Sequence, residues 1–485
     1  MHDMQPTPER DPVHWVPPGS FSVPQHYYPR VPNARLHPLV RYFLGLGNDR
    51  MANRYCHLHP EVKPAAVHAA LAHSTRYLRW AGADLFHVTT DRGMRLNVVI
   101  EVNSSPSGQK SMPLHDDEDD LGGYRTLLER TVMPMLKRRA LPEGCLAVLW
   151  DKNEMETSGY AAALAEIAGE PVLSVCCQAD PVEPVIDLRD GVIFARTSEG
   201  WQPIRAAFRY VTQRPWTRIP PLTRTALVNP VVACLAGGRN KLLAAKAYDL
   251  HNGSLKASGL KIRAPETIWD VSLREVPLWV ARMGGLAVVK DPYSNAGQGV
   301  FTITSQIELD AFMDHRHRYD RFIVQALIGN SQWTSGTQDG RLYHLGTVPD
   351  KNGDIYVADL RFMVGNSPDG FYPLALYGRR ARKPLSTTLT DGEDSWGMLG
   401  TNLSVKVSEG GFTTEPTRLM LMDNRDFNKL GLGLDDLTEA YIQTVLSVTA
   451  IDQMAQQLVT SKGVFRHRFF QGIVPDAALS EEIMR

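Results

Sequence analysis

The sequence predicts an α/β protein, and three features of the chain support that prediction. With 485 residues and 43% hydrophobic side chains, the chain exceeds the roughly 250 residues that one core usually serves, which indicates two to three domains. Residues 144–230 alternate strand-like apolar runs with a helical stretch, a pattern typical of a largely parallel sheet covered by helices. Residues 276–430 consist mainly of strands separated by glycine-bearing loops, which adds an α+β part.

The front of the chain divides into an arm and a strand-rich segment. Residues 1–40 are rich in proline, so we expect an extended arm that packs over another part or stays loose. Residues 60–80 have helical periodicity, and two strand-like runs follow at 83–90 and 96–103, joined by the turn sequence TDRG. We bound this second segment at residues 41–140.

The remaining chain divides into an α/β segment, a strand-rich segment and a helical end. The α/β segment, residues 141–232, has a hairpin-like part near 185–201. Residues 233–430 begin with a helical stretch and continue as strands. Residues 431–485 are helical by pattern.

The composition limits the class of partner. Lysine and arginine number 52 against 53 aspartates and glutamates, a net charge of −1, so no overall electrostatic attraction favours a nucleic acid or a membrane surface. The five cysteines are odd in number and lie mostly in apolar runs, so we expect reduced, buried thiols. The N-terminus lacks a basic segment leading into an apolar one, and no run approaches ~18 apolar residues, so we expect a cytoplasmic protein.

One strand-turn-strand segment carries oxygen atoms at a spacing that suits a metal ion. Glu101 and Asn103 are separated by one residue, so on a strand they face the same side. Asp84, on the preceding strand, would supply a third oxygen. Mg²⁺ prefers one or two carboxylates completed by phosphates and water, so the hairpin predicts a magnesium platform for a triphosphate. Taken alone, the pattern also fits the solvated face of an amphipathic strand.

A second segment has the features of a phosphate-binding loop. An apolar strand ends in Lys290, and the loop after it holds Ser294, Asn295, Gly297 and Gly299. Glycines let backbone N–H groups approach phosphate oxygens, and the lysine adds a positive charge. An apolar run follows the loop, so we expect a flexible hairpin cover, and the Walker pattern GxxxxGK[ST] is absent.

Two further segments fit a nucleotide. Lys241 begins a helix after a pair of glycines, a place where a phosphate is favoured. Lys246 competes for this role, and either residue could be an ordinary surface lysine. Residues 322–329 form an apolar strand whose backbone could recognise the edge of an adenine, although a plain core strand fits equally well.

An arginine-rich pair of strands would complete the site. Asp359 and Arg361 share one strand face, and the next strand carries Arg379 and Arg380. A forked guanidinium suits bidentate contact with a carboxylate or a transferring phosphoryl group. Asn402 follows and would extend this wall. The alternative is that these arginines pair with surface acids.

Together these blocks resemble the ATP-grasp superfamily, in particular its circularly permuted members. Ordinary members, such as D-alanine:D-alanine ligase, carry the lysines, the glycine-rich loop, the hinge strand and the D-x-R strand before the G-x-D and E-x-N-x-x-P-G blocks. Here GAD at 82–84 and EVNSSPSG at 101–108 come first. The resemblance covers residues 60–410 and implies an ATP-grasp fold in circularly permuted order, with an inserted Rossmann-like pre-ATP-grasp domain.

The resemblance also implies roles for individual residues. The ligands of two Mg²⁺ ions would be Asp84, Glu101 and Asn103. The ATP phosphates would be contacted by Lys241 and Lys290, beneath the loop that contains Ser294, Asn295, Gly297 and Gly299. The adenine hinge would consist of Gln325, Ala326, Leu327 and Ile328. The phosphate and acyl-phosphate site would be lined by Arg361, one of Arg379 or Arg380, and Asn402.

The implied activity is that of an ATP-dependent carboxylate-amine ligase. A carboxylate attacks the γ-phosphate of ATP to give an acyl phosphate and ADP, and an amine then displaces phosphate to form an amide or peptide bond. The substrates would be an amino acid or small peptide-like carboxylate and an amine, and members often form homodimers. A non-catalytic nucleotide-binding scaffold with the same fold is the alternative, which the presence of Glu101 and Lys290 disfavours.

A rival from another class is a metallohydrolase built on histidines. The candidate groups are Cys56, His57 and His59, and the pair His315 and His317. Neither group has C-x-x-C or H-E-x-x-H spacing, so structural histidines are the expected outcome.

Overall fold

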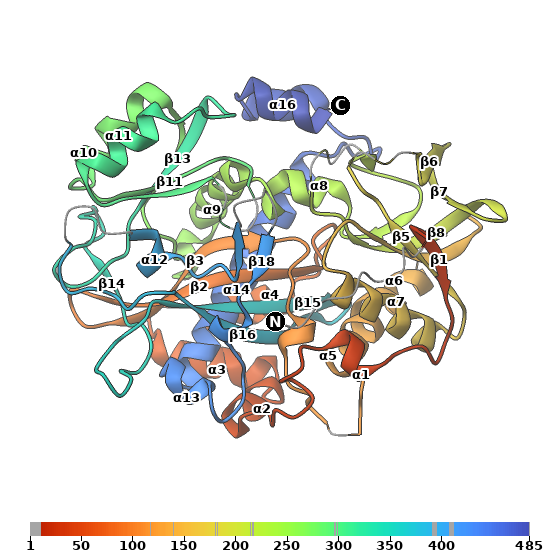
Figure 1. Ribbon diagram of the computed structural model, residues 1–485, viewed down its shortest axis with the longest axis horizontal. Helices are drawn as coiled ribbons and strands as arrows, with labels where there is room; N and C mark the ends of the chain where they lie inside the picture. Colours follow the sequence, from red (N-terminus) through yellow and green to blue (C-terminus); the bar gives the residue numbers. More distant parts are fainter. Residues whose placement is uncertain are drawn as a thin grey trace.

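A computed structural model describes residues 11–484, apart from 117, 139, 180, 182, 214, 216, 217, 295, 296, 298, 390–394 and 407–411. Figure 1 shows a mixed α/β molecule with a central sheet, a smaller sheet at the upper left and a third sheet at the right. The candidate site described below lies where the central and smaller sheets face each other.

The central sheet has the order β14-β2-β15-β16-β19, with β3 paired to β2, and neighbouring strands are antiparallel. Its strands are β2 (Trp80–Thr90), β3 (Arg95–Asn103), β14 (Leu342–His344), β15 (Ala358–Ser367), β16 (Gly370–Arg380) and β19 (Leu419–Met420). Phe362 faces helix α14 (Leu434–Gln457), where its ring centre lies 5.8 Å from that of Tyr441. Arg361 and its cross-strand neighbour Asp84 therefore face the opposite side, toward the smaller sheet.

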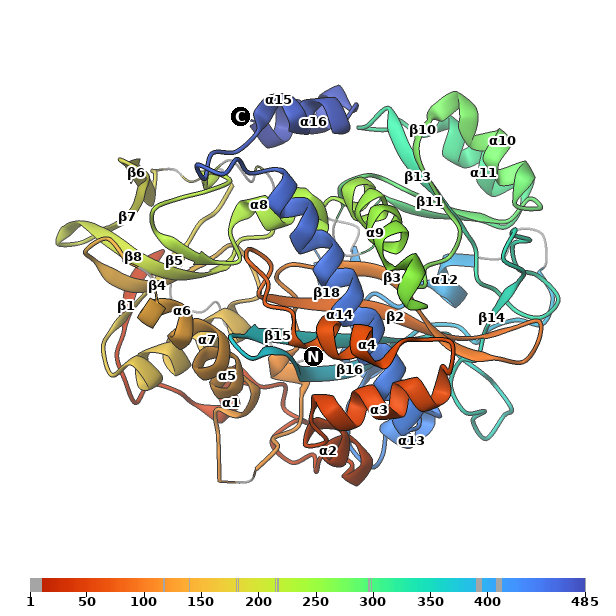
Figure 2. The ribbon, with the colours of Figure 1, turned by 180° about the vertical axis from the view of Figure 1, so that it is seen from behind.

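Helix α14 is the core helix of the molecule. Figure 2 shows it crossing in front of the central sheet, with α9 (Lys241–Leu255), α3 (Asn48–Leu58) and α4 (Pro64–Ala72) beside it. Its residues are buried almost continuously from Leu437 to Asp452. A helix that is buried on all sides must satisfy its polar side chains internally.

Asp452 illustrates that requirement and allows a stability test. Its side chain is fully buried, and Oδ1 accepts from the backbone N–H groups of Tyr77 and Leu78 at 2.7 and 2.8 Å. It also accepts from the N–H of Arg76. We expect Asp452→Ala to lower the free energy of unfolding by roughly 3 kcal/mol or more, because three buried donors lose their acceptor. Asp452→Asn keeps Oδ1 and should cost clearly less, and equal losses in chemical denaturation would contradict this account.

The third sheet has the order β1-β5-β4-β8-β7-β6, with β9 paired to β8. Its strands are β1 (Val13–Val16), β4 (Cys145–Trp150), β5 (Val172–Cys176), β6 (Ile186–Arg189), β7 (Val192–Thr197), β8 (Gly200–Tyr210) and β9 (Ala226–Val228). Strands β5, β4, β8 and β9 are parallel, and α7 (Glu154–Ala168) packs on them. The expected hairpin is β6–β7, but it continues this sheet because the first residues of β8 pair with β7. The sheet is therefore mixed rather than largely parallel.

The described part of the proline-rich arm is packed, not loose. Strand β1 pairs antiparallel with the edge strand β5. The side chain of Tyr27 is 1% exposed, and its hydroxyl donates to the carbonyl of Leu121 at 3.1 Å. The N–H of Tyr28 donates to the carbonyl of Lys110 at 3.0 Å. The arm is thereby tied to the segment that follows the β2–β3 hairpin.

The smaller sheet separates its apolar and polar residues by strand alternation. Its strands are β10 (Thr267–Ser272), β13 (Arg321–Ala326), β11 (Ala287–Lys290) and β12 (Val300–Ile303), paired antiparallel in that order. Val289 and Val324 pack with helices α10 (Val276–Arg282) and α11 (Gln306–Asp314). Lys290 and Gln325 have the opposite parity and face the central sheet.

The other elements complete the surface and the chain end. The remaining helices are α1 (Val23–His26), α2 (Pro38–Leu44), α5 (Gly122–Leu127), α6 (Met133–Arg138), α8 (Val231–Ala233), α12 (Ser395–Leu399), α13 (Phe427–Leu430), α15 (His467–Ile473) and α16 (Ala477–Met484), and β17 (Ser404–Lys406) pairs with β18 (Phe412–Thr414). All five cysteines are free thiols. Cys177 and Cys234 are buried as expected, whereas Cys56, Cys145 and Cys176 are partly exposed. None of the helices in the described ranges is long and apolar enough to cross a membrane.

Candidate functional site

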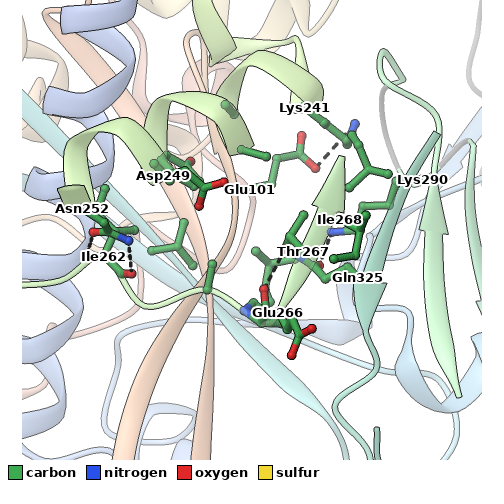
Figure 3. Close-up of a pocket in the computed structure, with 18 of the residues that line it drawn as sticks. Glu101, Lys241, Asp249, Asn252, Ile262, Glu266, Thr267, Ile268, Lys290 and Gln325 are labelled. Atoms are coloured by element: carbon green, nitrogen blue, oxygen red, sulfur yellow. Dashed lines mark hydrogen bonds and ion pairs between the residues drawn. The ribbon is translucent and has the colours of Figure 1, made fainter. Parts of the chain in front are cut away.

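Within the described residues, three cavities meet where the sheets face each other. The α9 cavity, about 400 Å³, runs along α9, β3 and β10 and is drawn in Figure 3. The inter-sheet cavity, about 100 Å³, lies between the smaller and central sheets. The basic cavity, about 390 Å³, lies between the central sheet and the end of the third sheet. Glu101 lines all three cavities and therefore stands at their junction.

Two lysines approach Glu101 across the cleft (Figure 3). Lys241 Nζ lies 3.9 Å from Glu101 Oε2 and donates to the carbonyl and hydroxyl oxygens of Ser294 at 2.9 and 3.1 Å. Lys290 is 5% exposed, and its Nζ donates to Gln325 Oε1 at 2.7 Å. Burial lowers the pKa of Lys290 to about 8, an effect that Glu101 opposes and Lys241 reinforces. An anionic ligand at this point would stabilise both ammonium groups.

A buried ion-pair network crosses the central sheet beside Glu101. Asp84 lies opposite Glu101 on one side and opposite Arg361 on the other. Arg361 donates from Nε to Asp84 Oδ1 at 2.5 Å and from Nη2 to Asp84 Oδ2 at 2.7 Å. Arg379 Nη2 lies 2.9 Å from Asp84 Oδ2. Arg379 also pairs with Asp359, its cross-strand neighbour. Burial raises the pKa of Asp84, but the two arginines outweigh it and hold the value at about 2.

The predicted magnesium ligands separate into two kinds. The Glu101 side chain is 28% exposed and opens into the cleft. Asn103 Oδ1 accepts from Arg239 at 3.3 Å, while its Nδ2 is buried without a hydrogen-bond partner. These two oxygen donors fit Mg²⁺ completed by phosphate and water. The Asp84 carboxylate is instead held by two arginines, so it would have to exchange these ion pairs to reach a metal ion.

The glycine-bearing loop lies against residues that follow β16, among them Trp396 and Asn402. Gly299 has φ +62°, and a Cβ there would meet Asp291 Oδ2 at 2.1 Å. Gly297 has φ +76°, and a Cβ there would lie 2.5 Å from Asn402 Nδ2. Gly297 and Asn402 line both the inter-sheet and basic cavities. The predicted loop residue Asn295 lies outside the described residues.

The predicted hinge residues, 325–328, all line the inter-sheet cavity. The N–H of Leu327 donates to Ser335 Oγ at 2.8 Å, and its carbonyl accepts from Thr334 Oγ1 at 3.0 Å. The N–H of Ala326 donates to the carbonyl of Glu266 at 2.8 Å. The N–H and carbonyl groups of Leu327 therefore already have partners, and adenine recognition by residues 325–328 stays a prediction.

The inter-sheet cavity is a slot with apolar walls. Phe86 and Ile100 line it from the central sheet, and Val288 and Leu327 line it from the smaller sheet and the residues after β13. Trp396, on α12, forms part of its boundary. Sequence reasoning missed three of these residues: Phe86, Ile100 and Trp396. Phe86 lies two residues after Asp84 on one strand, so the shared strand face could have revealed it. Nothing in the sequence around Trp396 distinguishes that residue.

The structure distinguishes the alternatives that the sequence left open. Arg379 lines the inter-sheet and basic cavities, whereas the guanidinium of Arg380 lies over the ring of Tyr356, 4.6 Å from its centre, and lines neither. Adjacent residues on a strand face opposite sides, so only one of the two can enter the site. Lys246 Nζ donates to the carbonyl of Ile473 at 2.7 Å, away from Glu101. Lys241 is therefore the lysine at the junction.

The histidine groups have structural partners. His59 Nε2 lies 2.7 Å from Glu439 Oε2, and His317 Nε2 lies 2.8 Å from the carbonyl of Phe312. The described residues contain no group of three or more histidine, cysteine, aspartate or glutamate side chains placed to hold a metal ion.

The two adjacent arginines should differ sharply in their effect on stability. We expect Arg379→Ala to lower the free energy of unfolding by about 3 kcal/mol or more, because Asp359 and Asp84 lose a buried cationic partner. Arg380→Ala, the matched control, removes a half-buried cation–π contact and should cost about 1 kcal/mol or less. Chemical denaturation of both variants measures the difference, and similar losses would contradict the assignment.

No family model and no curated protein matches the sequence. Among solved structures, the chain is similar to a RimK domain ATP-grasp protein from Sphaerobacter thermophilus DSM 20745, with 16% identity and a TM-score of 0.28 over 48% of this chain and 89% of that chain. It is also similar to a glutathione synthetase-like effector, GSS30, from Globodera pallida, with 8% identity and a TM-score of 0.40 over 72% and 85% of the respective chains. A third similar structure is D-alanyl-alanine synthetase A from Vibrio cholerae O1 biovar eltor str. N16961. Its sequence identity is 10% and its TM-score is 0.28, over 49% of this chain and 89% of that chain. These TM-scores lie below 0.5, so the function proposed below rests on the geometry of the site.

Proposed function

We propose that the protein is an ATP-dependent carboxylate-amine ligase with an ATP-grasp fold in circularly permuted order. The observation that carries the proposal is the junction at Glu101. There a carboxylate from the central sheet meets Lys241 and Lys290 from across the cleft, between an apolar slot and a basic cavity. A nucleoside triphosphate needs these three environments in this order: an apolar base site, cations for phosphates, and a space for the group that is phosphorylated.

In this proposal the chain binds and orients ATP before any bond changes. The adenine enters the inter-sheet slot against Phe86 and Ile100, and the phosphates extend toward Lys241 and Lys290. Glu101 and Asn103 hold Mg²⁺, which supplies charge neutralisation at the phosphates. Such sites accelerate phosphoryl transfer mostly by positioning and by stabilising charge.

The reaction that these groups support is carboxylate activation. A substrate carboxylate in the basic cavity attacks the γ-phosphorus, the bond to the ADP oxygen breaks, and an acyl phosphate forms. An amine then attacks the acyl carbon and phosphate leaves, giving an amide. Arg379, fixed by two carboxylates at the boundary of the two cavities, is placed to stabilise the transferring phosphoryl group.

The pairing of β2 with β15 supports the permuted order. The motif strands β2 and β3 come from the front of the chain, yet β2 lies between β3 and β15 in one sheet. Moving a hairpin from the end of a chain to its front leaves such a sheet intact, because neighbours in a sheet need not be neighbours in sequence. The domain bounds proposed from the sequence, a cytoplasmic location and a homodimer belong to the same proposal.

Release of ADP and phosphate tests the function. We expect release to require Mg²⁺ and to rise when the correct carboxylate and amine are added together. Equimolar ADP, phosphate and amide would support a ligase. ATP binding without ADP formation across a broad panel of carboxylates and amines would favour the non-catalytic scaffold instead.

A further inference from the structure

The basic cavity contains positive charge that the site described so far does not use. Lys110 and Lys152 line this cavity and neither of the other two, so they stand apart from Lys241 and Lys290. Arg239 lines both the α9 and basic cavities and lies close to the junction. The cavity therefore has one cationic region at the junction and another at Lys110 and Lys152.

Apart from Glu101 at the junction, the acidic side chains on and near this cavity are already committed to other partners. Asp84 is held by Arg361 and Arg379. Glu156 is buried and accepts from the Ser107 hydroxyl at 2.7 Å and from the N–H of Gln109 at 3.0 Å. Asp151, next to Lys152 in sequence, is 9% exposed and accepts from two backbone N–H groups, of Thr212 and Gln213, at 2.8 and 2.6 Å. These carboxylates do not neutralise the two lysines by direct contact.

Neither lysine has a direct ionic partner among the described residues. Lys110 Nζ donates to Asn153 Oδ1 and lies 4.9 Å from the ring centre of Tyr28. Lys152 has no hydrogen-bond partner among the described residues and is half-buried. Burial lowers the pKa of Lys152 to about 8, and Arg239 reinforces the shift. Burial also lowers the pKa of Lys110. Glu156 opposes the shift of Lys110 and Asp151 that of Lys152, but neither carboxylate pairs with its lysine among the described residues. Two partly buried ammonium groups without a direct ionic partner are typical of a site completed by an anion.

We propose that the carboxylate substrate carries a second acidic group, and that Lys110 and Lys152 bind this distal group while the reacting carboxylate lies at the Glu101 junction. The inference rests on the proposed ligase function and adds the class of substrate: a dicarboxylate or a phosphorylated carboxylic acid. Tyr28, from the N-terminal arm, forms the wall beside Lys110. The arm therefore contributes directly to substrate selection.

The cavity fits this substrate better than it fits the ATP phosphates. The phosphates have Lys241 and Lys290 at the inter-sheet cavity, where the apolar slot provides a place for the base. The basic cavity is instead bordered by hydroxyl and amide groups such as those of Ser111 and Asn153, which suit a small polar acid.

Calorimetric titration of matched pairs tests the proposal. The probes are L-glutamate against L-glutamine and O-phospho-L-serine against L-serine, each titrated into the full chain with saturating ADP and Mg²⁺. We expect at least one acidic probe to bind at least tenfold more tightly than its neutral partner. Lys110→Met and Lys152→Met should each weaken that probe about tenfold, because each removes a charge-assisted contact. The matched control Lys246→Met, outside the basic cavity, should bind it like the unmodified protein.

The outcomes separate the inference from the function on which it rests. Equal binding of the neutral probes, unchanged affinity in both lysine variants, or no binding of either acidic probe would overturn the inference. ADP affinity is measured in the same variants and should stay unchanged. If ADP does not bind the unmodified protein, the proposed function fails instead. A preference for glutamate or for phosphoserine distinguishes a distal carboxylate from a distal phosphate.

Discussion

Glu101→Gln is expected to lower ATP-dependent turnover by about three powers of ten. The carboxylate stands at the junction of the three cavities, and the substitution replaces the charged member of the two proposed magnesium ligands by a neutral amide, a much weaker donor to Mg²⁺. A loss of that size corresponds to about 4 kcal/mol of transition-state stabilisation, as expected for metal-assisted phosphoryl transfer. The side chain is partly exposed and glutamine has the same shape, so the fold should remain intact. Steady-state ADP release and electron paramagnetic resonance titration of Mn²⁺ measure the two effects.

The control for this variant is Glu129→Gln. Glu129 makes an exposed ion pair with Arg125 and lines none of the three cavities. It should leave both turnover and Mn²⁺ affinity unchanged. Normal Mn²⁺ binding in Glu101→Gln would remove the metal assignment, even if turnover fell.

Lys290→Met is expected to weaken ATP binding about 10- to 100-fold. Within the described residues, the buried ammonium faces the cleft and donates its hydrogen bond to a neutral group, Gln325. A phosphate would gain a charge-assisted hydrogen bond worth about 1.5–3 kcal/mol. Methionine keeps most of the apolar stem and removes the charge. Fluorescence titration with a labelled ATP analogue gives the dissociation constant.

Lys246→Met is the matched control for the lysine variant. Its ammonium donates to the carbonyl of Ile473 and lies over the ring of Trp269, so it does not approach Glu101. Its ATP affinity should equal that of the unmodified protein. If the two variants lose affinity equally, the effect is not specific to the cleft, and the phosphate-binding role of Lys290 would be withdrawn.

Much of the candidate site could be predicted from the spacing of residues within single strands, because the alternation of strand faces is visible in a sequence. The separation of Glu101 and Asn103 by one residue predicts a shared face, and both line the basic cavity. Lys290 at the end of an apolar strand was predicted to face a ligand, and it lies in the cleft. The helix that begins at Lys241 was likewise expected, and the structure shows that Asn240 caps it by accepting from the N–H of Leu243.

Residue spacing does not predict the register between strands that are distant in sequence. Asp84 was predicted as a metal ligand from the β2–β3 hairpin, in which it lies opposite Glu101, but the sequence does not show that Arg361 of β15 lies opposite it on the other side. The choice between Arg379 and Arg380 depends on which face of β16 meets the cleft. Lys110 and Lys152 lie in separate segments before β4 and after it, so only the fold brings them into one cavity.

A crystal structure with a non-hydrolysable ATP analogue and Mn²⁺, located by its anomalous signal, tests the central claim most directly. We expect the adenine in the slot between Phe86 and Leu327, the phosphates at Lys241 and Lys290, and Mn²⁺ on the oxygens of Glu101 and Asn103. Asp84 should keep its ion pairs with the arginines. An analogue bound outside this cleft, or Mn²⁺ bound away from Glu101, would contradict the account.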